Sequence, residues 1–100
     1  MTTTVTLDRY VLESLMADLA GHDRTPAAYL VFLAIWSAGD GERVALSYAE
    51  IAARTGLSRR TVQTGVAHLH RRELLEMERS GPTETPRYRP RTPWRRWQGV

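Results

Sequence analysis

The sequence predicts a mainly α-helical domain in which an N-terminal helix and a β-hairpin accompany a three-helix core. Three observations carry this prediction. Two short helical patterns flank the tetrapeptide Thr55–Ser58, which is too short for anything but a sharp turn. Two more apolar helical patterns precede them, and a stretch that alternates at period two follows them. The length of 100 residues suits one domain with a single modest core.

The first helix is expected over residues 8–20, with Gly21 ending it. Its apolar residues fall on one face, and they are Val11, Leu12, Leu15, Met16 and Leu19. This stripe is wider than a small core needs. It either covers the domain or pairs in part with a second copy of the chain.

The second helix is expected to begin at Pro26 and to continue to about Ala38. Thr25 is placed to cap it, and a proline at the first helical position is pre-organised for the helix. Apolar residues surround this helix, so it should be the central core helix, with Tyr29 and Trp36 in the core. The glycines at 39 and 41 end it.

A short strand is expected at residues 43–46, followed by two helices. Ser47 can cap the first of these, and Gly56 can take the left-handed conformation that ends it. Ser58 can then cap the next helix, over residues 58–72. Two helices joined by a short turn that contains glycine form a helix-turn-helix arrangement.

The helix 58–72 leaves a polar, basic side facing outward. Its outward residues are Arg59, Arg60, Gln63, Thr64, Ala67, His68 and Arg71. Arginine, glutamine and threonine side chains at the start of an exposed helix can reach base edges and phosphates in a major groove. The alternative is the solvated face of an ordinary helical hairpin.

A β-hairpin is expected after this helix. Residues 74–79 alternate at period two, residues 80–86 break the pattern with glycine and proline, and residues 87–89 resume it. Pro86 must lie where the ladder needs no donor.

The charge of the chain is unevenly distributed. Residues 1–42 carry two arginines against six acids, a balance of −4, whereas residues 43–100 carry twelve arginines against five acids, a balance of +7. All 14 basic residues are arginines, and arginine is the better bidentate partner for phosphate and guanine. The half with the helix-turn-helix pattern therefore favours a polyanion.

Residues 44–90 resemble the winged helix-turn-helix domains of bacterial DNA-binding proteins, in particular small regulators and plasmid or phage replication modules. The similarity lies in Ala49-Glu50-Ile51-Ala52, in Thr55-Gly56-Leu57-Ser58-Arg59-Arg60-Thr61-Val62, and in Leu69 and Leu74-Leu75. It implies a mainly α fold with a small β wing. Two residues depart from the pattern. Glu73 replaces the glycine that usually ends the recognition helix, which should therefore end by another route, and Gly65 replaces a commoner alanine and allows a close backbone approach.

The resemblance implies sequence-specific binding of double-stranded DNA in transcriptional regulation, with helix 58–72 in the major groove and the wing, residues 75–90, on the backbone. The candidate base readers are Arg59, Arg60, Gln63, Thr64 and His68. The candidate backbone contacts are Ser47, Tyr48, Thr61, Arg79, Arg87 and Arg89. A domain of this size reads few base pairs, so a homodimer through helix 8–20 is expected.

The last ten residues differ in composition from the rest, so the expected division is a domain over residues 1–90 and a basic Arg/Trp tail over residues 91–100. The tail contains Trp94 and Trp97 among three arginines. It either extends as a disordered chain that contacts DNA, or folds back onto the core, or lies on a membrane surface, for which it is short.

Several classes of site are not expected. The chain has no cysteine, no glycine-rich phosphate loop and no HExxH or serine-nucleophile motif, so we expect no enzyme and no cofactor. No metal site is expected, because His68 and His70 point apart on a helix and His22 beside Asp23 lacks a third ligand within predictable reach. The apolar run at residues 27–36 is too short to cross a membrane, which suggests a cytoplasmic protein.

Two alternatives to transcriptional regulation remain open from the sequence. One is a protein-interaction module that uses the winged scaffold and docks through the first helix or the Trp tail. The other is the DNA-binding component of replication initiation.

Overall fold

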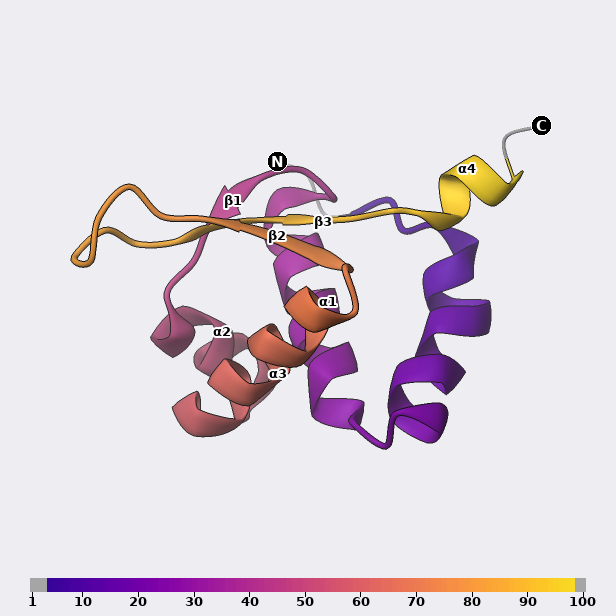
Figure 1. The fold of residues 1–100 in the computed structure, drawn as a ribbon, viewed down its shortest axis with the longest axis horizontal. Helices are drawn as coiled ribbons and strands as arrows, with labels where there is room; N and C mark the ends of the chain where they lie inside the picture. The colour runs from indigo at the N-terminus through magenta and orange to yellow at the C-terminus, as the bar shows by residue number, and fades with distance from the viewer. Residues whose placement is uncertain (1–3, 99–100) are drawn as a thin grey trace.

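The computed structural model describes residues 4–98. Its helices and strands are η1 (Val11–Leu15), η2 (Asp18–His22), α1 (Pro26–Gly39), β1 (Val44–Ala45), α2 (Tyr48–Thr55), α3 (Arg59–Arg71), β2 (Leu75–Glu78), β3 (Arg87–Pro90) and α4 (Trp94–Gln98). Figure 1 shows the sheet across the top with α1, α2 and α3 beneath it, and the N-terminal helix at the side opposite the hairpin tip. The predicted order of elements is confirmed, with α4 as an addition.

The N-terminal helix is wound more widely than the sequence indicated. Both η1 and η2 are π-helical, with bonds such as Asp23 N–H to the Asp18 carbonyl at 2.9 Å. Helical backbone continues to His22, so the expectation that Gly21 ends it is wrong.

Only part of the apolar stripe of this helix enters the core. Val11, Leu15 and Leu19 are buried at intervals of four residues, whereas Leu12 and Met16 remain 51% and 42% exposed. The stripe is therefore wider than the core of one chain uses, as expected from the sequence.

The central helix α1 begins at Pro26 and is buried on most sides, as predicted. Tyr29 and Trp36 lie in the core, and each polar edge has a partner: the Tyr29 hydroxyl donates to the Val11 carbonyl at 2.8 Å, and the Trp36 indole N–H donates to the Thr6 carbonyl at 2.7 Å. Thr25 does not cap α1 with its side chain, which donates instead to the Leu19 carbonyl at 3.1 Å.

The turn between α2 and α3 forms as the sequence predicts. Ser47 and Glu50 make a reciprocal capping box at the start of α2, and Gly56 ends that helix at φ 80°. The Ser58 hydroxyl accepts from the Thr61 N–H at 3.1 Å, which caps α3. These local bonds fix the direction in which α3 leaves the turn.

Gly65 is the point where α3 crosses α1 closely. A Cβ at Gly65 would lie 3.1 Å from Val31 Cγ2 and 3.4 Å from Ala28 Cα. The close backbone approach expected from this glycine is confirmed. This close contact places the Gly65 side of α3 against the central helix, so the opposite side of α3 faces outward.

The way α3 ends differs from the prediction that a helix without glycine at position 73 must end by another route. Glu73 takes the left-handed conformation at φ 57°, so the helix ends by the same route that a glycine would provide. The Glu73 N–H donates to the His70 carbonyl at 3.0 Å and the Leu74 N–H to the Leu69 carbonyl at 2.9 Å, which is the Schellman pattern.

Replacing Glu73 with glycine is expected to stabilise the protein. The left-handed conformation costs a residue with a Cβ about 1–2 kcal/mol, part of which the greater freedom of glycine in the unfolded chain offsets. We expect a net gain of about 0.5–1 kcal/mol in the free energy of unfolding, measured by urea denaturation. The control is Glu73→Ala, which removes the same carboxylate but keeps the Cβ; an equal gain in both variants would contradict this explanation.

The three strands form one antiparallel sheet in the order β1-β3-β2. Val44 pairs with Tyr88, and Met77 pairs with Tyr88 from the other side. Tyr88 is fully buried on the face toward the helices. The carbonyl of Pro86 accepts from the Leu46 N–H at 3.1 Å, so this proline serves as an acceptor where no donor is needed.

Trp94 of the C-terminal tail folds back onto the N-terminal helix, and α4 lies beside that helix (Figure 1). Trp94 is 1% exposed and stacks on Tyr10 at 4.8 Å between ring centroids, with 12° between the planes. Its indole N–H donates to Asp8 at 2.8 Å, and Arg95 bonds the same carboxylate. Trp97 is 65% exposed. Of the alternatives for the tail, the structure shows packing onto the core through Trp94; residues 99–100 lie outside the described residues.

Candidate nucleic-acid interface

The first two turns of α3 present an exposed polar surface. Arg59, Arg60, Gln63 and Thr64 are all exposed, and the Thr64 hydroxyl donates to the Arg60 carbonyl at 3.0 Å. On the opposite side of the helix, the buried residues Val62, Val66 and Leu69 anchor it in the core. The helix is thus fixed along one side and open along the other.

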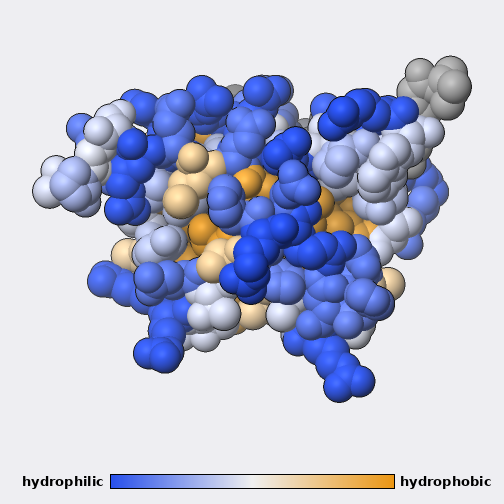
Figure 2. All heavy atoms as spheres, viewed as in Figure 1, coloured by the Kyte–Doolittle hydropathy of each residue, from blue (hydrophilic) through white to orange (hydrophobic). Residues whose placement is uncertain are grey.

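The guanidinium groups at the start of α3 are not neutralised by any acidic side chain within residues 4–98. Among the described residues, no ion pair includes Arg59 or Arg60. Residues 91–98 of the tail do not cover them either, because α4 lies at the other end of the molecule (Figure 1). Side chains over α2 and α3 form a largely hydrophilic surface in the lower left of Figure 2.

Three of the expected backbone contacts lie at the helix starts. Ser47 and Thr61 are half-buried in the two capping arrangements, where the Ser58 hydroxyl donates to Thr61 Oγ1 at 2.9 Å. Tyr48 begins α2 and is half-buried against the core. Their positions follow directly from the helix-turn-helix geometry.

The wing carries the other expected contacts, and acidic residues accompany them. Arg87 and Arg89 point to the outer face of β3, and the register places Glu78 opposite Arg87 and Glu76 opposite Arg89. The Arg87 guanidinium lies 3.7 Å from Glu78. Arg79 is exposed directly after β2.

His68, predicted to read bases, has a partner within its own chain. Its Nε2 lies 2.7 Å from Asp23 Oδ2, and its side chain is 19% exposed. The ring is therefore directed toward the segment between η2 and α1. The sequence offered no signal for this contact, because the partners are 45 residues apart.

Asp23 connects the end of the N-terminal helix to the last turns of α3. Burial raises the pKa of Asp23, but hydrogen bonds from His22, His68 and Arg72 outweigh it and lower that pKa from 3.8 to about 2. Arg72 also bonds Asp18 at 2.6 Å, and this bond, above all, raises the pKa of the guanidinium. Sequence reasoning missed this network.

The hydrogen bonds of Asp23 with His22, His68 and Arg72 make the free energy of unfolding depend on pH in the acidic range. Because the folded pKa lies below the unfolded one, the stabilisation is complete above pH 3.8 and is lost as the pH falls toward 2. We expect the free energy of unfolding to fall over this range, and to fall less in Asp23→Asn. Urea denaturation at a series of pH values measures this difference. The exposed wing residue Glu84 supplies the control, Glu84→Gln; identical pH slopes in the two variants would contradict the assignment.

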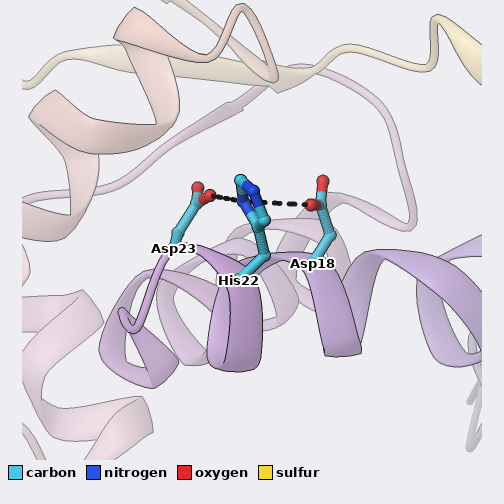
Figure 3. Close-up of side chains that lie close together, drawn as sticks. All are labelled: Asp18, His22 and Asp23. Atoms are coloured by element: carbon cyan, nitrogen blue, oxygen red, sulfur yellow. Dashed lines mark hydrogen bonds and ion pairs between the residues drawn. The ribbon is translucent and has the colours of Figure 1, made fainter.

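A cluster of possible metal ligands lies at the same place. Asp18, His22 and Asp23 each offer a ligand atom, all within 4.8 Å of one another, and Figure 3 shows the His22 ring between the two carboxylates. The expectation that His22 and Asp23 lack a third ligand is wrong, because Asp18 lies four residues before His22 and on the same side of the helix.

A helix-turn-helix, capped and exposed along its second helix and followed by a β-hairpin, defines a winged helix-turn-helix DNA-binding domain. A comparison with protein-family models matches residues 22–83 to the MarR family. This match spans more than half of the chain, so the chain belongs to the MarR family. It is therefore a DNA-binding transcription regulator with a winged helix, as the resemblance implied.

The other comparisons add no relative. No curated protein and no solved structure matches the chain significantly. Members of the MarR family are regulators and not enzymes. Within residues 4–98, no helix is both long and apolar enough to cross a membrane.

Proposed function

We propose that the chain regulates transcription by placing α3 in the major groove of a specific duplex sequence, with the wing on the adjacent backbone. The observation that supports this most is the pair of exposed guanidinium groups of Arg59 and Arg60 on a helix fixed by the Ser58 cap and by Gly65. Rigid presentation of arginines that have no acidic partner within residues 4–98 suits bidentate recognition of guanine and phosphate. A cytoplasmic location, where bacterial DNA lies, belongs to this proposal.

The proposed base readers are Arg59, Arg60, Gln63 and Thr64, without His68. The proposed backbone contacts are Ser47, Tyr48, Thr61, Arg79, Arg87 and Arg89. The acidic partners of the arginines support this division between base readers and backbone contacts. Arg59 and Arg60 have no acidic partner among the described residues, whereas Arg87 faces Glu78. Wing contacts should therefore add less affinity than α3 contacts.

Selection of bound sequences from a random duplex pool tests this function directly. We expect one enriched motif. We also expect its binding to fall with salt by about 0.9 log units per log unit of salt for each phosphate neutralised. The alternative, a module that docks on proteins through apolar surface such as Trp97, predicts no enriched motif and little response to salt.

We further propose that the chain acts as a homodimer through the N-terminal helix. Leu12 and Met16 form an exposed apolar strip on this helix, and the MarR family usually forms dimers. Two copies would read a repeated half-site and so reach useful specificity.

Analytical ultracentrifugation tests the dimer. The parent chain of 11.4 kDa should sediment at twice this mass, and Leu12→Glu with Met16→Glu should sediment as a monomer. The matched control is Leu30→Glu, an equally exposed apolar residue on α1. A parent chain that is monomeric at high concentration would remove the proposal.

A further inference from the structure

We propose that Asp18, His22 and Asp23 form a binding site for a divalent transition-metal ion of the zinc type. All three residues lie in or directly after η2, and their side chains project from the same side of this helix end (Figure 3). The proposal does not depend on DNA binding.

The distances between the ligand atoms suit one ion. His22 Nδ1 lies 3.0 Å from Asp23 Oδ1 and 3.9 Å from Asp18 Oδ1. Nitrogen and oxygen ligands that each bond zinc at about 2.1 Å lie roughly 3–3.5 Å apart. All three ligand atoms lie within 4.8 Å of one another, so the Asp18 carboxylate would have to move closer to His22 Nδ1 for one ion to bond all three.

The two oxygens of each aspartate have different partners, and this division is the second observation that supports the site. Arg72 bonds Asp18 and Asp23 through their Oδ2 atoms, and His68 also bonds Asp23 Oδ2. The Oδ1 atoms of both aspartates are left facing His22 Nδ1. Groups that hold ligating carboxylates through their outer oxygens are a regular feature of metal sites, because they orient the ligands.

The donor set indicates the kind of ion. One imidazole nitrogen with two carboxylate oxygens favours zinc or a similar first-row metal over magnesium, which prefers oxygen ligands and retains its water. The His22 side chain is 81% exposed, so an ion could enter from solvent and keep water as its fourth ligand.

Calorimetric titration of the untagged, EDTA-treated chain with zinc chloride tests the site. We expect saturable binding of one ion per chain and no saturation with magnesium chloride. His22→Ala and Asp18→Asn should each weaken zinc binding about tenfold or more. His22 is exposed, so its replacement should leave the fold intact, which circular dichroism checks.

The matched control is His70→Ala, which removes an exposed histidine of α3 outside the cluster and should bind zinc like the parent. Cobalt(II) gives a second readout, since the parent should show visible absorption that His22→Ala loses. Absence of zinc binding in the parent, or equal affinities in His22→Ala and His70→Ala, would overturn the proposal. Loss of DNA binding in any variant would bear on the proposed function and not on this site.

Discussion

Replacing Trp94 with alanine is expected to lower the free energy of unfolding by about 3–5 kcal/mol, the range for deleting a buried aromatic side chain. Trp94 is 1% exposed, stacks on Tyr10, and lies edge-on to Phe32 at 6.4 Å between centroids. Its indole N–H also donates to Asp8. One side chain thus joins the C-terminal tail, the N-terminal helix and the central helix.

Urea denaturation followed by circular dichroism measures this loss. Trp97→Ala is the matched control, because Trp97 lies three residues away but is 65% exposed and has only an edge-on contact with Tyr10; its cost should stay within about 1 kcal/mol. If Trp94→Ala does not fold, Trp94→Phe keeps an aromatic ring but loses the bond to Asp8, and it should show a smaller, measurable loss. Equal stabilities of the Trp94→Ala and Trp97→Ala variants would show that the tail does not complete the core.

The features predicted correctly from the sequence are those encoded by neighbouring residues. Pro26 at a helix start, Gly56 past a helix end, and Ser58 as a cap all act within one turn of the chain, so their effect does not depend on the rest of the fold. The alternation after α3 is equally local. These signals were sufficient to predict the helix-turn-helix, the wing and the direction of the exposed side of α3.

The features missed by the sequence depend on contacts between distant residues. Asp23 meets His68 and Arg72, which lie 45 and 49 positions away, and Asp8 meets Trp94 at a separation of 86. No periodicity or spacing records such pairs. The contact between His68 and Asp23 was missed for this reason, since the helical pattern gives the direction of a side chain but not its partner.

Backbone conformation was the other source of error. Glu73 takes a left-handed conformation that glycine favours, because the chain must turn there to bring Leu74 and Leu75 into the core. The π-helical winding of η2 likewise could not be read from the apolar pattern, since a spacing of four residues fits α and π helices alike. The left-handed conformation of Glu73 and the π-helical winding of η2 each cost some free energy, but tertiary packing stabilises the fold by more than they cost.

Replacing Arg59 or Arg60 with alanine is expected to weaken binding to the selected duplex by about 1–3 kcal/mol each, if that arginine contacts a base edge, and to relax the preference at one base position. Both side chains are exposed and have no acidic partner among the described residues, so removing them costs the fold little. Fluorescence anisotropy at fixed salt, on the selected duplex and on a scrambled one, measures both effects. A base-reading residue changes the ratio of the two affinities.

The comparison with Arg87→Ala separates base reading from sequence-independent attraction to the phosphate backbone. Arg87 lies on the wing opposite Glu78, so its loss should weaken both duplexes alike and reduce the slope of affinity against salt by about one. Arg96→Ala, on α4 far from α3, should leave both affinities near the parent values and controls for net charge. If Arg59→Ala and Arg60→Ala bind both duplexes as tightly as the parent, α3 does not enter the groove.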